Sequence, residues 1–391
     1  MVKRMNLKKE WMKYGIAILA VGILVWVLIQ PTKGNHLNPE GELYSAKITE
    51  ELGKTTKNNT GYETTSIKYV AIITDARYKD QKINIEDVFE SSTPHIEAHV
   101  GDEVLLYLEL DESKTIVSNA YIVSYKRDRF IIYLIAIFII LVVAIGRLKG
   151  LKALISLILT VVLVLKVFLP RILLGDDPII LSVLIATLIS ITTIMIISGF
   201  SKKTLTSILG TLAGVLVAGV LAYTFSNYAK LIGFTYEEVQ QLTFIPQGTQ
   251  FNFSGLLFAS ILLGALGAVM DVSMSISSSI VEVKAANPNM GIKQLFQSGM
   301  NIGRDIMGTM VNTLILAYTG SSLNILILIL AYNKPLIETI NYDMIVVEIV
   351  RALAGTIGLV ITIPFTAIVA AYLNRAIKSK NAPNTIEEVK Q

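Results

Sequence analysis

The stretch LLGALGAVMDVSMSISSSIVEV, residues Leu262 to Val283, carries the strongest constraint on the fold. It begins like a membrane-spanning helix, because its first half is apolar and rich in glycine. It then places a carboxylate, Asp271, inside the span and becomes rich in serine. An ionised carboxylate at the centre of a bilayer costs at least ~2.5–3.5 kcal/mol on insertion scales. The acid therefore needs a partner, water or a proton.

The composition of the whole chain is that of a membrane protein. Of its 391 residues, 53% are hydrophobic and only 16% are charged, and the mean hydropathy is +0.60, beyond ordinary soluble usage. The apolar residues gather in runs of roughly 18–25, the length that crosses hydrocarbon as a helix. The chain has no cysteine, which excludes disulfides, thiolate nucleophiles and cysteine-ligated metals.

Residues 1–30 combine a basic flank with the apolar run IAILAVGILVWVLIQ. No small-residue cleavage site follows this run, so we interpret it as an uncleaved signal anchor and first transmembrane helix rather than a removed signal peptide. The positive-inside rule then places the N-terminus in the cytoplasm. The basic residues of the flank are Lys3, Arg4, Lys8, Lys9 and Lys13.

Residues 31–128 are polar and contain runs in which apolar and polar residues alternate. The alternation predicts strands near residues 66–78, 81–89, 103–110 and 119–125, with turns at Gly101-Asp102 and Asp111–Ser113. We therefore expect a small antiparallel sheet or barrel, forming an all-β domain on the extracytoplasmic side.

Residues 129–375 are predicted to form a transmembrane helical bundle, and residues 376–391 a cytoplasmic tail. With the anchor, the apolar runs predict about eight transmembrane helices. The last seven runs lie near residues 130–147, 151–170, 178–200, 204–226, 253–275, 304–333 and 345–373. The run at 304–333 is too long for one span, and Thr319–Ser322 is its natural break. Residues 323–333 would then be re-entrant or interfacial.

The connecting loops differ in charge and so predict sidedness. Lysine and arginine gather at residues 147–152, 202–203, 284–293 and 375–380, which we place in the cytoplasm with both termini. The loops with acids are placed outside; their acids are Asp176, Asp177, Glu237, Glu238, Glu338 and Asp343. The chain is thus predicted to be a multi-pass protein of the bacterial cytoplasmic membrane.

The two helices on either side of the predicted cytoplasmic connection VEVKAANPNMGIKQ each carry a stripe of polar residues. At 3.6 residues per turn, one helix face collects Gly264, Gly267, Asp271, Ser275, Ser278 and Glu282. The next helix repeats the pattern with Ser298, Asn301, Asp305, Thr309 and Asn312, and Arg304 lies beside them. We expect such stripes to face protein or water rather than lipid.

These stripes supply the candidate site residues. For proton or ion coupling the candidates are Asp271, Asp305, Asn312, Glu282 and Arg304; for helix packing they are Gly264, Gly267, Ser275, Ser278 and Thr309. A structural interpretation stays open beside the functional one. By position, Asp271 and Asp305 could reach interfacial water, Arg304 could clamp Glu282 or Asp271, and Asn312, the more buried, could make an interhelical hydrogen bond.

Three other patterns have simpler explanations. Gly210 and Gly214 form a G-x-x-x-G motif, which predicts a helix-packing face. Glu348 and Arg351 are one helical turn apart and should neutralise each other. The run His95-Ile-Glu97-Ala-His99 could offer metal ligands on one strand face, but the sequence lacks a second ligand cluster, so no metal is expected.

No enzyme signature is evident in the sequence. Asp271 and Asp305 could nominally form an aspartyl-protease pair, but neither lies in a motif typical of that chemistry. We therefore expect no catalytic residues and no cofactor. The expected partners are the lipid bilayer and an unknown substrate or membrane protein, with no nucleic acid; association with further copies of the chain stays open.

Three runs carry a resemblance to a known family. They are GALGAVMDVSMSISSSIVEV, NPNMG and FQSGMNIGRDIMGTMVNTLILAYTGSSL. With the layout of an anchor, a small β domain and a helical bundle, they resemble the YibE/F family of bacterial multi-pass membrane proteins over nearly the full chain. The resemblance implies this topology.

A looser likeness is to the proton-driven resistance-nodulation-division exporters and the related Sec auxiliary subunits. Gly264, Gly267, Asp271, Glu282 and the Thr319-Gly320 turn occupy similar places, although the number of spans differs and the β domain is smaller. We therefore expect a transport-type membrane protein, coupled to protons through intramembrane carboxylates. The alternative is a scaffold for assembly or sensing that transports nothing.

Overall fold

The computed structural model describes residues 42–59, 62–75, 78–90, 95–110, 117–233, 239, 241–244 and 251–375. The predicted anchor at 1–30, the tail at 376–391 and the predicted turn at Asp111–Ser113 lie outside these residues. The chain divides into two compact units, one ending at Ala144 and the other continuing from Ile145. Each unit has its own hydrophobic core.

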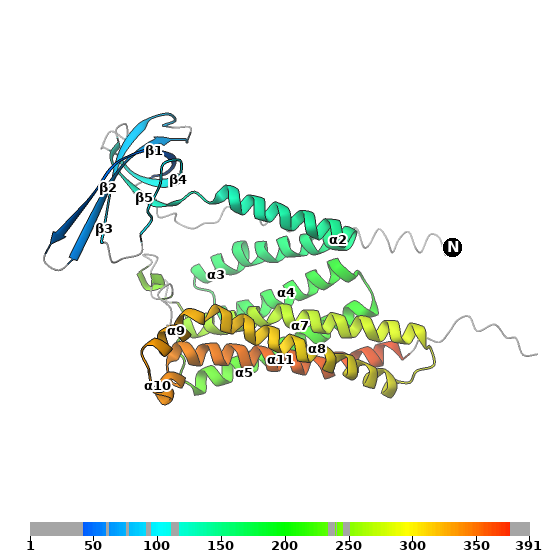
Figure 1. The fold of residues 1–391 in the computed structure, drawn as a ribbon. Helices are drawn as coiled ribbons and strands as arrows, with labels where there is room; N and C mark the ends of the chain where they lie inside the picture. The colour runs from blue at the N-terminus through cyan, green and yellow to red at the C-terminus, as the bar shows by residue number, and fades with distance from the viewer. Residues whose placement is uncertain are drawn as a thin grey trace, which may run out of the picture. The chain divides into compact units, whose positions relative to one another are not determined.

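The first unit holds a five-stranded antiparallel sheet with strand order β3-β2-β1-β4-β5 (Figure 1). The edge strands β3 and β5 also contact each other, so the sheet curls. The strands are β1 (Glu42–Asn59), β2 (Tyr62–Ile73), β3 (Lys82–Glu90), β4 (Glu103–Leu110) and β5 (Val117–Tyr125). The four strands predicted from alternation are confirmed, but the central strand β1 was not among them.

β1 was missed because only its first half alternates. Tyr44, Ala46 and Ile48 point into the core, whereas residues 51–57 are mostly polar and all exposed. The partner strand β4 follows the pattern from Glu103 to Leu108, with Val104, Leu106 and Leu108 fully buried. Two irregularities in the β1–β2 register, the first after Ile48, bend the long strand.

The second unit is helical, and the long helix that begins in the first unit and continues into the second is broken. Residues Asp128–Leu173 form 46 residues of nearly continuous helix, which would be roughly 70 Å long, over twice the ~30 Å of the hydrocarbon core. At Arg147 the backbone leaves the helical conformation (φ 48°, ψ −129°). The break separates two segments of span length, as predicted from the two apolar runs. Helix α2 (Asp128–Val162) contains it, and η1 (Leu163–Phe168) and α3 (Leu169–Leu173) follow.

Helix α7 (Phe253–Ala286) lies at the centre of the bundle. It packs against α4 (Pro178–Ser198), α5 (Lys202–Tyr228), α8 (Ile292–Ser321) and α11 (Asp343–Asn374). Side chains fix three of the helix starts: those of Asp177, Ser201 and Asn252 accept backbone N–H groups of α4, α5 and α7. The short elements η2 (Leu242–Phe244) and α10 (Leu336–Ile340) lie between the long helices.

Helix α8 ends at the break expected from the sequence. It is followed at Ser322 by α9 (Leu323–Ala331), and the two helices are bent by 62°. The expected start near residue 304 is wrong, because α8 begins at Ile292. Its first turns are too polar to register as an apolar run. Asp305 therefore lies near the middle of its helix and not near its end.

Small residues let α5 and α11 approach closely. A Cβ added at Gly210 would lie 2.0 Å from the hydroxyl of Thr366, and one at Gly214 would lie 1.7 Å from that of Thr362. The packing face predicted from the G-x-x-x-G motif is thus confirmed. By length and composition, five helices in the described part of the chain could cross a membrane, or six if α8 and α9 together form one span.

Candidate functional site

Helix α7 presents one narrow polar face to the outside of the bundle. Six of its residues there are exposed and Ser278 is half-buried, and no large apolar side chain of α7 is exposed. Neighbours along this face are three or four positions apart, so they share one side of the helix. We call these seven residues the polar stripe: Ser260, Gly264, Gly267, Asp271, Ser275, Ser278 and Glu282.

Asp271 occupies the middle of the polar stripe. Among the residues that the structure describes, its carboxylate has no hydrogen bond or ion pair. A Cβ added at Gly267, one turn away, would meet nothing within 4 Å. The acid thus has open space beside it, in which a proton, water or another helix can approach.

One end of the polar stripe joins a buried ion pair. The guanidinium of Arg351 donates to Glu348 Oε1 at 2.7 Å and to Ser260 Oγ at 3.4 Å. A Cβ added at Gly264 would lie 3.0 Å from the hydroxyl of Tyr318 on α8, and that hydroxyl is buried without a hydrogen-bond partner in the described residues. The predicted pairing of Glu348 with Arg351 is confirmed; its link to the polar stripe was not predicted.

The other end of the polar stripe also meets a cation. Lys203, at the start of α5, donates from Nζ to Ser278 Oγ at 2.7 Å. Glu282 is exposed one turn further along. Lys284 takes no part, because its buried ammonium donates to the backbone carbonyls of Pro288 and Met290. The polar stripe therefore runs from Arg351 at one end to Lys203 at the other.

Helix α8 carries the second polar face that the sequence predicted. Its buried side packs closely at two glycines: Gly299 lies against Ile280, and Gly303 lies against Ile276 and Ile363. Ser298 is half-buried, and the other polar residues are exposed. The exposed set, here called the α8 polar face, is Asn301, Arg304, Asp305, Thr309 and Asn312.

Two of the predicted contacts of these residues do not form. Arg304 donates to Asn301 Oδ1 at 3.1 Å and, within the described residues, makes no ion pair with Glu282 or Asp271. Asn312 is exposed rather than buried, because α8 packs through its glycine side. No hydrogen bond joins Asp271 to Asp305 or Asn312 in the described part of the molecule. Both polar faces thus point outward, and within the described residues no hydrogen bond or ion pair joins one face to the other.

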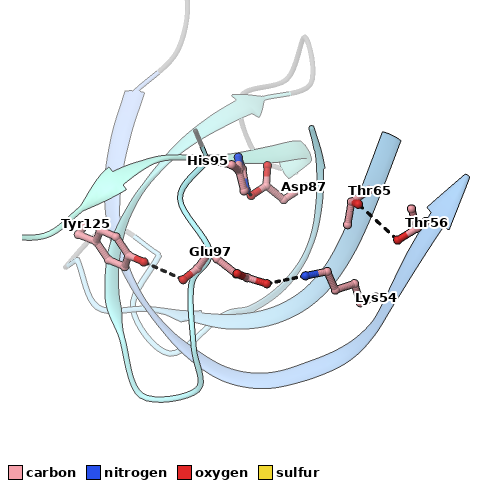
Figure 2. A network of polar contacts seen from close by, with 7 residues as sticks. All are labelled: Lys54, Thr56, Thr65, Asp87, His95, Glu97 and Tyr125. Atoms are coloured by element: carbon pink, nitrogen blue, oxygen red, sulfur yellow. Dashed lines mark hydrogen bonds and ion pairs between the residues drawn. The ribbon is translucent and has the colours of Figure 1, made fainter. Parts of the chain in front are cut away.

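The run from His95 to His99 in the sheet unit takes part in a network of polar contacts (Figure 2). Residues 95–99 are not a strand, so the expected shared strand face does not exist. His95 pairs with Asp87 at 2.8 Å, and Glu97 pairs with Lys54 at 2.6 Å. The hydroxyl of Tyr125 donates to the backbone carbonyl of Glu97 at 2.7 Å. Within the described residues, no three potential metal ligands come together.

The two carboxylates of this network differ in their surroundings. Burial raises the pKa of Asp87 above its ordinary value, and the nearby His95 offsets only part of this effect. The hydrogen bond and charge of Lys54 lower the pKa of the exposed Glu97. Both arrangements tie the segment after β3 to the sheet.

The polar stripe is therefore the strongest candidate site in the described residues. It offers hydroxyl groups, glycines and one central carboxylate along the whole length of a span-length helix. Such groups can pass protons or bind a polar partner in the membrane.

Comparison with known protein families matches residues 134–376 to the family described as YibE/F-like protein. The match covers the helical unit and the end of the preceding segment, and the five strands lie outside it. No curated protein and no solved structure matches the chain. The matched region contains both the polar stripe and the α8 polar face. The chain belongs to the YibE/F family.

Proposed function

We propose that the chain is a transport-type protein of the bacterial cytoplasmic membrane in which Asp271 carries protons along the polar stripe. One observation carries the proposal: the outward face of α7 has no large apolar side chain exposed over its whole length. Lipid would select apolar residues on such a face. The transported substrate is not identified by any described residue.

The position of the acid supports a role in coupling. Asp271 lies about midway between the cation at each end of the polar stripe, Arg351 and Lys203. A carboxylate at membrane depth is stable when it is paired, hydrated or protonated, and alternation between such states is how intramembrane acids move protons. Serine hydroxyls on the same face can relay hydrogen bonds.

The proposed topology has eight spans with both termini in the cytoplasm. Five helices qualify in the described residues, or six with the bent pair. The break at Arg147 divides the first of them into two segments of span length, and the predicted anchor at 1–30 would complete the set. The sheet unit then lies outside the cytoplasmic membrane.

Single cysteines introduced into this cysteine-free chain test that topology. Positions Lys202 and Lys284 should be protected from a membrane-impermeant thiol reagent in intact cells. Position Asp176 should react, as should Glu237, which lies outside the described residues. Labelling of a cysteine at position 284 from outside would overturn the proposed sidedness.

Proton flux in reconstituted vesicles tests the function. An imposed pH gradient should drive dye-detected proton movement through the native chain, and Asp271→Asn should abolish it while leaving insertion and melting temperature unchanged. Glu338→Gln is the matched control, because Glu338 is an exposed acid outside the polar stripe that pairs with Lys334. Equal flux through native protein and folded Asp271→Asn would refute proton coupling.

A scaffold or sensing function is the alternative, and one feature of the sheet favours it. Leu43, Tyr107 and Tyr121 lie side by side across β1, β4 and β5 on the side away from the core. Leu43 and Tyr121 are exposed, and such a row is typical of an interaction surface. Tyr121→Ser with normal proton flux but lost cellular activity would favour the scaffold.

A further inference from the structure

The polar stripe of α7 and the α8 polar face lie on adjacent helices and together leave opposite charges uncovered. Asp271, Glu282 and Asp305 are acidic, and Arg304 is basic; all four are exposed. In the described part of the chain, none of the four forms an ion pair. Charges at membrane depth are almost always paired or placed toward a polar cavity. In the bilayer this surface therefore needs either water or a polar protein surface beside it.

Contacts between the two helices place these charges at similar depths. Gly303 lies against Ile276, and Tyr318 against Gly264. Residues near Arg304 are therefore level with Ser275, one helical turn from Asp271. A partner that brings an acid and a base at this same depth would match the surface.

The rest of the chain offers no such match from its long helices. Helix α4 has no charged residue, α5 has none after Lys203, and α11 has none after Arg351. Helix α2 with η1 and α3 carries cations such as Lys166, but after Asp128 it has no acid that could face Arg304. The predicted anchor run Ile16–Gln30 is uncharged. The surface formed by α7 and α8 is itself the best complement, because it carries both signs of charge.

We propose that a second copy of the chain covers the polar stripe and the α8 polar face, with Arg304 of each copy facing Asp271 of the other. A two-fold axis along the membrane normal preserves depth, and it makes each contact occur twice. Gly264, Gly267 and Ser275 are small, so the second α7 can approach closely. The polar stripe then lies in the interface between the two copies.

Disulfide formation tests the contact directly. Gly267→Cys and Ser275→Cys place a thiol on the polar stripe, and oxidation in native membranes should convert most of each protein to a disulfide-linked dimer. Leu216→Cys is the control. It is exposed on α5, and Gly214 beside it lies against Val269, so its depth matches that of Gly267. Dimer from Leu216→Cys alone, or no dimer from either stripe position, would overturn the proposal.

Exchange of charges tests the specific pair. Two differently tagged copies are co-expressed: one carries Asp271→Arg, the other Arg304→Asp. Either variant alone should lose self-association, because positions 271 and 304 then carry like charges across the axis. Mixed together, both contacts again join opposite charges, so the two tags should co-purify. A pair within one chain could not be restored by mixing.

If a charged variant folds poorly, the cysteine variants still test the contact between the two copies. The cysteine variants change no charge, and their disulfides report proximity alone. A crosslink to a different protein at Gly267, or mixed variants that fail to co-purify while each still self-associates, would assign another occupant to the surface. The proposal goes beyond proton transport, because contact between copies is measured without flux.

Discussion

Helices α5, α7 and α11 are all apolar enough to cross a membrane, yet α7 presents a different surface from the other two. The outward residues of α5 and α11 are large and apolar, such as Leu216 and Val220 on α5 and Leu353 on α11. The outward residues of α7 are glycine, serine and acid. The average hydropathy of a span therefore does not tell what its exposed side faces.

The comparison also separates two uses of small residues. Threonine hydroxyls of α11 occupy the space beside Gly210 and Gly214 on α5, so these two glycines allow the helices to pack closely. Gly267 on the polar stripe meets nothing within 4 Å. Packing within the bundle accounts for Gly210 and Gly214, whereas Gly267 leaves room for another helix to approach.

The largest predicted effect comes from breaking the ion pair at the end of the polar stripe. Arg351→Ala would remove the cation that pairs with the buried Glu348, and removal of one partner from a buried pair costs about 3–5 kcal/mol. Thermal unfolding in detergent should show a clear fall in melting temperature. Replacing both residues with methionine should recover most of it; an unchanged melting temperature for Arg351→Ala would contradict the account.

The second largest effect is expected when an aspartate is introduced on the apolar outward face of α5 rather than on the polar stripe of α7. Leu216→Asp puts a carboxylate on the apolar side of α5, where insertion scales give a cost of about 2.5–3.5 kcal/mol at the span centre. Ser275→Asp puts it on the polar stripe and should cost much less. Membrane abundance and melting temperature of the two variants measure the difference. Equal losses would remove the distinction between the faces.

A smaller difference in stability is expected between alanine variants of a packed glycine, Gly214, and an open one, Gly267. Gly214→Ala forces a methyl group against Thr362 and should destabilise the bundle by about 1–3 kcal/mol, as overpacking does. Gly267→Ala should leave the fold and melting temperature of the single chain unchanged, because its Cβ meets no atom. Detergent melting curves compare them, and a loss at Gly267 as large as at Gly214 would be evidence against an open stripe.

The smallest effect concerns a carboxylate outside the spans. Burial raises the pKa of Asp87 above its ordinary 3.8, so its contribution to stability is present at low pH and is lost as pH rises through the raised value. Above that pH, Asp87→Asn should be more stable than the native sheet. Melting of a fragment of residues 40–126 followed from about pH 3 to 7 measures this, and the fragment should show β-type circular dichroism. Parallel curves of melting temperature against pH for the native fragment and for Asp87→Asn would contradict the raised pKa of Asp87.

Local patterns predicted much of this fold. Alternation located four of the five strands, and apolar runs located the long helices. The glycine and serine at Thr319–Ser322 predicted the break before α9. The period of 3.6 residues also placed six of the seven residues of the polar stripe, all but Ser260, on one helix face, because a helix face follows from spacing alone.

Other features needed the tertiary structure. The start of α8 at Ile292 was missed because an amphipathic helix has no continuous apolar run. The ends of the polar stripe were missed because Lys203 and Ser278 are 75 positions apart, and Ser260 and Arg351 are 91 apart. Nor could the sequence tell that Ser273 and Ser277 donate hydrogen bonds to the backbone carbonyls of Ser207 and Lys203 on α5, because these contacts join residues 66 and 74 positions apart.

Lipid exposure along α7 is the most direct test of the central claim, that its outward face does not meet lipid. Nitroxide labels on single cysteines at Gly267 and Ser275, and at Leu216 and Leu353 for comparison, would be measured in vesicles for collisions with dissolved oxygen, which concentrates in hydrocarbon. The account predicts few collisions at the two stripe positions and many at Leu216 and Leu353. Equal, high collision rates at all four positions would contradict it.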